Sequence, residues 1–166
     1  MVDSVWQEKI TQLANQLNTK QLTLGTAESC TGGGLSYALT STPGSSTWFE
    51  CGLVTYSLAA KMSLLGVKQS TLDEYSAVSQ ETAKEMVDGL LERYPIDIGV
   101  AITGLAGPGG GSLAIPVGTV WIACKRRAHV PHAAHYLFTG DRETIREKSI
   151  AAAIDLLLRQ ISDGAR

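Results

Sequence analysis

Segments with the pattern of a strand and segments with the pattern of a helix alternate along the whole chain. Short runs typical of strands stand at 21–27, 48–56, 98–103, 119–124 and 135–138. Helical spacing of apolar residues and helix-capping residues predict helices near 6–17, 32–42, 58–65, 79–94 and 141–161. This alternation indicates an α/β layered domain with a largely parallel or mixed sheet.

Size and charge limit the classes of protein to which the chain can belong. Its 166 residues fit a single domain, 1–166, and 44% hydrophobic against 18% charged residues is an ordinary globular balance. The net charge of −2 argues against nonspecific binding to nucleic acid, and the basic run at 125–127 is expected at a solvated turn. The sequence shows neither a membrane-spanning run nor a secretory signal. We therefore expect a cytoplasmic domain without nucleic-acid or membrane partners.

The cysteines and histidines form no recognised disulfide or metal pattern. The three cysteines are an odd number without CxxC or CxH spacing, which favours a reducing compartment. The three histidines lie together at 129, 132 and 135, but on a strand the middle one would point away from the other two. We expect partly exposed histidines and no metal site.

A hydroxyl group follows the first predicted strand, where a glycine-rich turn begins the next helix. The run at 28–34 reads Glu-Ser-Cys-Thr-Gly-Gly-Gly. Unpaired N–H groups and the helix dipole at such a turn would let Ser29 combine a nucleophile with an oxyanion hole. The alternative is that Ser29 or Thr31 merely caps the helix. Cys30 is a rival nucleophile without a nearby histidine, so a buried, inert thiol is the simpler interpretation.

Without an available histidine, Ser29 needs another base. Lysine can serve if burial lowers its pKa. Tyr56 and Lys61 lie at the end of the second predicted strand and on the following helix, so both could reach the turn that carries Ser29. Neutral Lys61 could then accept the serine proton directly or through the Tyr56 hydroxyl. The alternative is that Lys61 is an ordinary surface lysine.

The segment at 104–118 is rich in glycine and follows the most apolar strand. Five glycines stand among its first eight residues. Glycine lets the backbone approach a ligand closely or adopt positive φ. The loop could therefore hold a phosphate or a ribose, although a mobile surface loop explains the composition almost as well.

Together these pieces resemble one family, the C-terminal domain of the competence-damage-inducible CinA proteins, which also occurs alone as nicotinamide-nucleotide amidase. The likeness extends in order from about residue 5 to residue 160. The runs that carry it are TAESCTGG at 26–33, PGSS at 43–46, VTYS at 54–57, AK at 60–61, LGV at 65–67, AVS at 77–79, ITGLAGP at 102–108, PVGTVW at 116–121 and GDR at 140–142.

The resemblance implies a three-layer α/β/α sandwich with a mixed, largely parallel sheet. It also implies that the carboxamide of nicotinamide mononucleotide, a small-molecule nucleotide, is hydrolysed to nicotinic acid mononucleotide and ammonia. Neither a metal nor a cofactor is required for this reaction. A homo-oligomer is the expected assembly.

The resemblance also implies roles for individual residues. Ser29 becomes the nucleophile, Lys61 the general base, and Tyr56 the relay or the partner of the lysine. The remaining assignments are substrate contacts: backbone N–H groups at Thr31, Gly32 and Gly33 for the oxyanion, and Glu28, Cys30, Thr103, Gly104, Gly107 and Arg142 near the nucleotide.

Two stretches depart from the family pattern. Leu58 and Ala59 stand where the family usually has Asn-Glu, and 113–115 is apolar where the family usually carries charged residues that end in lysine. Both departures remove polar groups beside the expected site or alter a subunit contact. Two alternatives therefore stay open: an amidase for a different, less anionic amide, and a nucleotide-binding module without catalysis.

Overall fold

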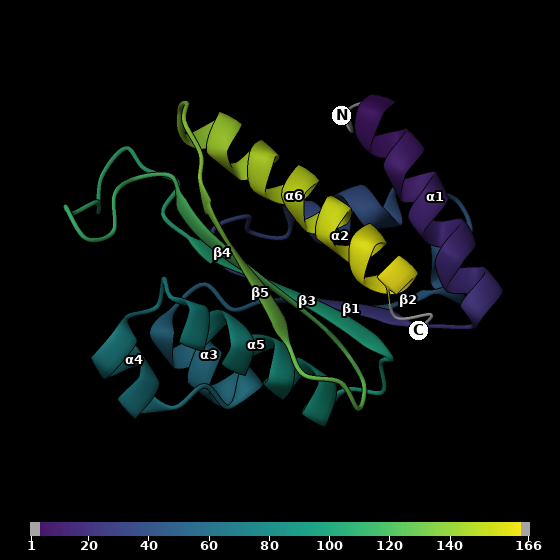
Figure 1. Cartoon of the computed structure of the whole chain (residues 1–166), viewed down its shortest axis with the longest axis horizontal. Helices are drawn as coiled ribbons and strands as arrows, with labels where there is room; N and C mark the ends of the chain where they lie inside the picture. Colours follow the sequence, from purple (N-terminus) through teal and green to yellow (C-terminus); the bar gives the residue numbers. More distant parts are fainter. Residues whose placement is uncertain (1–3, 164–166) are drawn as a thin grey trace.

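The computed structural model describes residues 4–163, which contain one mixed sheet of five strands (Figure 1). Their order across the sheet is β2-β1-β3-β4-β5. β1 pairs in parallel with β2 and β3, whereas β4 is antiparallel to both β3 and β5. The strands are β1 (Leu24–Glu28), β2 (Phe49–Val54), β3 (Ile98–Gly104), β4 (Thr119–Arg126) and β5 (His132–Leu137).

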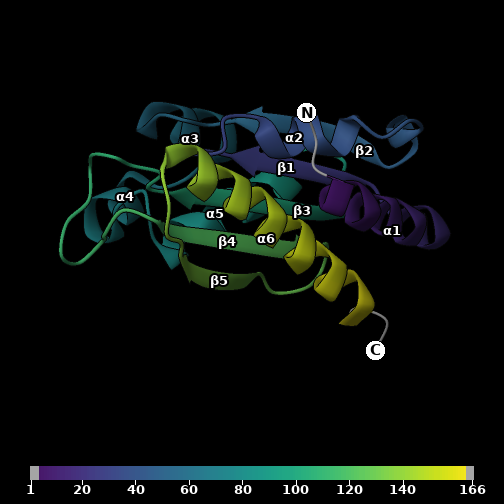
Figure 2. The same ribbon diagram turned by 90° about the horizontal axis from the view of Figure 1, so that it is seen from above.

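Helices cover both faces of this sheet, so the fold is a three-layer α/β/α sandwich (Figure 1, Figure 2). This confirms the predicted fold class. One face carries α1 (Ser4–Lys20), α2 (Gly34–Thr40) and α6 (Arg142–Asp163). The other face carries α3 (Leu58–Leu65), α4 (Gln69–Tyr75) and α5 (Gln80–Arg93), and the 3₁₀ turn η1 (Ser45–Thr47) leads into β2.

The central strand β3 is buried on both faces, which explains its apolar sequence. Ile98, Val100 and Ile102 belong to the apolar cluster shared with α1, α2 and α6. Ala101, which points to the opposite face, belongs to the cluster shared with α5. Alternate side chains of one strand thus hold the two helix layers together.

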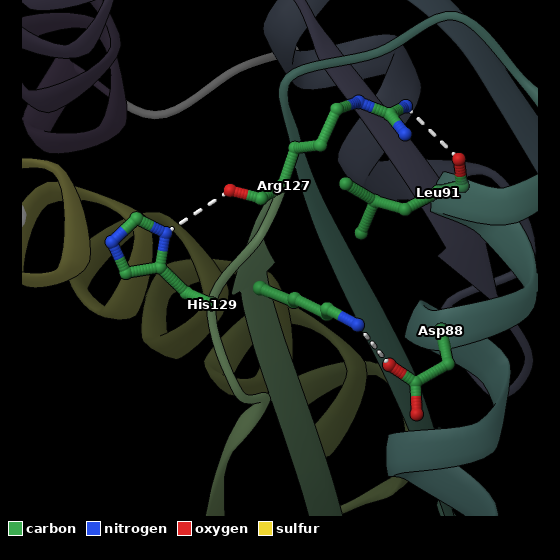
Figure 3. Close-up of polar contacts among 5 residues, drawn as sticks. Asp88, Leu91, Arg127 and His129 are labelled. Atoms are coloured by element: carbon green, nitrogen blue, oxygen red, sulfur yellow. Dashed lines mark hydrogen bonds and ion pairs between the residues drawn. The ribbon is translucent and has the colours of Figure 1, made fainter.

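Polar contacts fix α5 against the end of β4. Lys125 forms an ion pair with Asp88, with 2.7 Å between Nζ and Oδ1. Arg127 donates to the carbonyl oxygen of Leu91 at 2.9 Å, at the end of α5, and its own carbonyl oxygen lies 3.1 Å from Nδ1 of His129 (Figure 3). The basic run at 125–127 therefore contributes to the packing of α5 and is more than a solvated turn.

The structure adds one helix that the sequence pattern did not predict. α4 has seven residues and buries only Thr71 and Leu72, so it is too short to show helical periodicity. The last strand, β5, also begins three residues before the predicted segment at 135–138.

No described helix is both long and apolar enough to cross a membrane. Among residues 4–163, no three His, Cys, Asp or Glu side chains are grouped closely enough to hold a metal ion. The ring of His135 lies against Trp121, with 4.7 Å between the ring centroids.

Candidate active site

The carboxyl ends of β1, β2 and β3 meet at one edge of the sheet because these strands are parallel. A cavity of about 220 Å³ lies at this edge. It is smaller than most ligand pockets, so it fits the reacting end of a ligand whose remainder lies outside. The lining residues are Ser29, Cys30, Tyr56, Lys61, Ala77, Val78, Thr103, Gly104, Leu105, Ala106 and Arg142.

Ser29 and Lys61 meet in this cavity. β1 and β2 are adjacent, and the N–H of Thr55 donates to the carbonyl oxygen of Glu28 at 2.8 Å. The chain then enters α3, which has Ser57 as its N-cap. Lys61 lies in the first turn of α3, and its Nζ is 2.9 Å from Oγ of Ser29. Strand pairing and a short helix thus bring residues 32 positions apart into hydrogen-bond contact.

The environment of Lys61 suits a general base. Its side chain is only 1% exposed, and this burial lowers its pKa from 10.5 to about 8. Besides Ser29, its Nζ contacts the carbonyl oxygens of Thr55 at 2.7 Å and Tyr56 at 3.3 Å. A neutral amine has two N–H bonds and one lone pair, and carbonyl oxygens can only accept. In the neutral form the two carbonyls therefore take the N–H bonds and leave the lone pair directed at the Ser29 hydroxyl, whereas in the ammonium form Nζ donates to Ser29 Oγ.

Cys30 lines the cavity but is a poor nucleophile. Burial raises the pKa of its thiol to about 11. The thiol therefore stays protonated at neutral pH, and the thiolate is the reactive form.

Glu28 points into the protein rather than into the cavity and caps α2. Its carboxylate is fully buried and accepts four hydrogen bonds. The donors are the Thr31 hydroxyl at 2.7 Å, the Leu35 N–H at 2.9 Å, and the N–H and hydroxyl of Ser36 at 3.0 and 2.6 Å. The N-cap position itself is Gly33, which makes no side-chain cap bond. The capping alternative for Ser29 and Thr31 is therefore wrong, because the neighbouring glutamate performs that role.

The substitution Glu28→Gln is expected to lower the free energy of unfolding by about 2 kcal/mol, the cost of leaving a buried donor unpaired. An amide NH₂ replaces one carboxylate oxygen, so the N–H of either Leu35 or Ser36 loses its acceptor. Urea denaturation measures the change. Glu50→Gln is the matched control, because Glu50 is exposed on β2. Equal stability of the two variants would contradict this role of Glu28.

Two arginines on α6 contact the segments that surround the site. Arg142 donates to the carbonyl oxygen of Gly107 at 2.7 Å and to the Tyr56 hydroxyl at 3.2 Å. Arg146 donates to the carbonyl oxygens of Cys30 at 3.1 Å and Thr31 at 3.3 Å. Arg146 was not predicted from the sequence; its place four residues after Arg142, on the same helical face, is the signal that could have indicated it.

Thr31, Gly32 and Gly33 were predicted to donate their N–H groups to the oxyanion. They follow Ser29 and Cys30, the two residues of this turn that line the cavity. The N–H of Gly32 donates to the carbonyl oxygen of Ser29 at 3.0 Å, so it is engaged. The N–H groups of Thr31 and Gly33 have no acceptor among the described residues. Gly32 and Gly33 both have positive φ, 59° and 96°, which a tight turn from β1 into α2 requires.

The structure brings only some of the predicted substrate contacts to the cavity. Cys30, Thr103, Gly104 and Arg142 line it, whereas Glu28, Thr31, Gly32, Gly33 and Gly107 do not. Two apolar lining residues, Ala77 and Val78, were not predicted, whereas Leu105 and Ala106 belong to the glycine-rich segment 104–118 that was expected near the ligand. None of the described lining residues is acidic.

Comparison with models of known families covers almost the whole chain. The model of the CinA C-terminal domain matches residues 7–161. The chain belongs to the CinA C-terminal domain family. This confirms the resemblance found in the sequence.

The chain is similar to named relatives over nine-tenths or more of their length. The chain is 46% identical over 149 residues to the nicotinamide-nucleotide amidohydrolase PncC of Pseudomonas putida, covering 90% of this chain and 92% of that protein. It is 41% identical over 160 residues to the PncC of Escherichia coli K12, covering 96% and 97%. The crystal structure of the competence/damage inducible protein CihA from Agrobacterium tumefaciens superposes with a TM-score of 0.93 at 37% identity, covering 96% and 97%.

Proposed function

We propose that this protein hydrolyses the carboxamide of nicotinamide mononucleotide, with Ser29 as nucleophile and Lys61 as general base. The observation that carries the proposal is the 2.9 Å contact between the buried Lys61 amino group and the Ser29 hydroxyl. The names of the relatives from Pseudomonas putida and Escherichia coli supply the substrate. Both of those proteins are similar to this chain over nine-tenths or more of its length.

The first half of the reaction forms an acyl-enzyme. Ser29 Oγ bonds to the carboxamide carbon while its proton passes to the neutral Lys61 amine. The carbonyl π electrons move to oxygen, where the N–H groups of Thr31 and Gly33, which have no acceptor among the described residues, are available to stabilise the charge. When the intermediate collapses, the C–N bond breaks and the Lys61 ammonium returns the proton to the leaving nitrogen. Ammonia departs and the nicotinoyl ester of Ser29 remains.

The second half restores the enzyme. Water gives a proton to Lys61 and bonds to the ester carbon, and the ester C–O bond then breaks. Ser29 Oγ takes back the proton from Lys61, and the free carboxylic acid leaves. One side chain thus serves as base and then as acid in each half, as microscopic reversibility requires.

The backbone carbonyl of Tyr56 accepts a hydrogen bond from Lys61. Tyr56 also lines the cavity. The side chain is 59% exposed, and the hydroxyl accepts from Arg142. The proton of that hydroxyl has no acceptor among the described residues, so it is available to a bound substrate. Because Lys61 contacts Ser29 directly, the direct proton route is the one we propose, rather than a relay through Tyr56.

Arg142 suits the phosphate of a nucleotide. Its guanidinium lies at the cavity, which has no acidic lining residue among those described. A planar guanidinium pairs readily with phosphate oxygens. Neither departure from the family pattern lines the cavity: Leu58 and Ala59 begin α3, and residues 113–115 are also absent from the lining. This supports the nucleotide substrate over the two alternatives, a different amide or a silent binding module.

A cytoplasmic homo-oligomer completes the proposal. All three cysteines are free, which suits a reducing compartment. The exposed apolar side chains of Val54 and Leu58 lie at the end of the edge strand β2 and the start of α3, where a subunit contact would cover them. Analytical ultracentrifugation measures the assembly.

The test is ammonia release by the purified protein from nicotinamide mononucleotide. We expect turnover of the mononucleotide and far weaker turnover of its riboside, because the riboside lacks the phosphate that Arg142 would bind. Preference for the riboside would instead favour the less anionic amide. Ligand-induced thermal stabilisation without turnover of either compound would indicate a binding module.

A further inference from the structure

The turn between α4 and α5 has an unusual backbone where it meets the cavity. Ser76 ends α4 with φ 70° and ψ 170°, a region that residues other than glycine rarely occupy. The next two residues, Ala77 and Val78, line the cavity. A strained residue immediately before two lining residues indicates that the surrounding contacts impose the shape of this turn.

Hydrogen bonds from the turn itself and from α5 account for part of this shape. The carbonyl oxygen of Ser76 accepts from the hydroxyls of Ser79 at 3.1 Å and Thr82 at 2.7 Å. The Ser76 hydroxyl accepts from the N–H of Val78 at 3.2 Å. These bonds are local and do not fix the position of the turn relative to the sheet.

Thr103 provides the bond from the sheet. It is 1% exposed at the end of β3, and its hydroxyl donates to the carbonyl oxygen of Ala77 at 2.7 Å. Both residues line the cavity that contains Ser29 and Lys61. The hydroxyl proton is therefore already engaged with the protein, at a residue that the family resemblance placed near the nucleotide.

We propose that Thr103 is a positioning residue: its bond to Ala77 holds the 76–79 turn as the apolar wall against which the aromatic ring of the substrate packs. Leu105 and Ala106 supply the rest of the apolar lining. Burial of one ring face on this wall orients the carboxamide toward Ser29. This inference rests on the proposed function, since it names the part of the substrate that the wall contacts.

The experiment compares Thr103→Val, which keeps the shape but removes the donor, with Thr103→Ser, which keeps the donor. With nicotinamide mononucleotide, Thr103→Val is expected to raise KM about tenfold, the effect of one hydrogen bond, and to change kcat by less than about threefold. Thr103→Ser is expected to restore KM to within about threefold of the wild-type value. A purely structural role of Thr103 would not give this split between KM and kcat.

A second readout does not depend on the natural substrate. Sulfonyl fluorides label a reactive serine hydroxyl, and mass spectrometry measures the rate of adduct formation on Ser29. Thr103→Val is expected to slow labelling by phenylmethanesulfonyl fluoride about tenfold while leaving methanesulfonyl fluoride, which has no ring, unchanged. Thr23→Val is the control, because the Thr23 hydroxyl bonds to Asp97 at the start of β1, at the opposite edge of the sheet.

The outcomes separate the inference from the function. Unchanged KM and labelling rates in Thr103→Val overturn the inference, and so does equal slowing of both reagents, which would place the effect on Ser29 itself. Failure of the proposed function appears separately, as a wild-type protein that releases no ammonia. In that case the ratio of the two labelling rates still decides the role of Thr103.

Discussion

Ser29→Ala is expected to reduce ammonia release from nicotinamide mononucleotide by at least about 10³-fold, because removal of a nucleophile removes the covalent route. The loss should appear in kcat, while binding of the mononucleotide stays close to wild type, since the lining and Arg142 are unchanged. A coupled ammonia assay measures kcat, and titration calorimetry measures binding.

The fold of Ser29→Ala should remain intact. Only the hydrogen bond with Lys61 is lost, which changes the free energy of unfolding by about 1 kcal/mol. Ser46→Ala is the matched control, because Ser46 is exposed in η1 away from the cavity. Full turnover by Ser29→Ala would remove Ser29 from the role of nucleophile.

Lys61→Met is expected to lower kcat by about 10²–10⁴-fold, the usual contribution of a general base. In the wild-type protein only the neutral amine can accept the Ser29 proton. With a pKa of about 8, kcat/KM should rise with pH through about 8 and level off above it. The residual activity of Lys61→Met should lack this rise.

The same pKa links Lys61 to stability. Burial lowers the folded-state pKa from 10.5 to about 8, so between these values the unfolded chain binds more protons than the folded one. The free energy of unfolding of the wild-type protein therefore rises with pH across this window, by about 3 kcal/mol in total. The burial penalty is fully present below pH 8 and is relieved above about 10.5.

Lys61→Met should lose this part of the pH dependence. The thioether side chain avoids the burial penalty but leaves the carbonyl groups of Thr55 and Tyr56 without their donor, so the two effects oppose each other at pH 7. Denaturation of both proteins at several pH values between 8 and 10.5 gives the difference. Lys68→Met is the control, since Lys68 is exposed. Identical pH profiles for wild type and Lys61→Met would show that the lysine is not the buried base.

Local patterns in the sequence were sufficient to predict most elements of the fold. α3 occupies the predicted 58–65, with Gly66 at its C-cap, because the capping chemistry lies within the segment. α4 was missed because it buries too few residues to show a period. The contact of Ser29 with Lys61 was predictable in outline, since adjacent parallel strands end at the same edge.

Other parts of the site depend on contacts between distant segments, which no local pattern reports. Arg146 reaches the carbonyl oxygen of Cys30 across 116 positions. The bond from Thr103 to Ala77, on which the proposed positioning role rests, spans 26 positions. The family resemblance placed Glu28 near the substrate together with Ser29, but successive residues of an extended chain point in opposite directions. Its carboxylate therefore points into the protein and caps α2.

The support of the nucleophile turn by α6 affects when the protein can become active during synthesis. A ribosome delivers Ser29 and Lys61 well before the helix that carries Arg142 and Arg146. The nascent chain thus contains both reacting side chains while the carbonyl groups of Cys30 and Thr31 still lack their donors. Hydrolysis should begin only when the last helix docks. A premature stop before residue 142 would yield a chain that contains Ser29 and Lys61 but lacks the two arginines of α6 that bond to the loops around them.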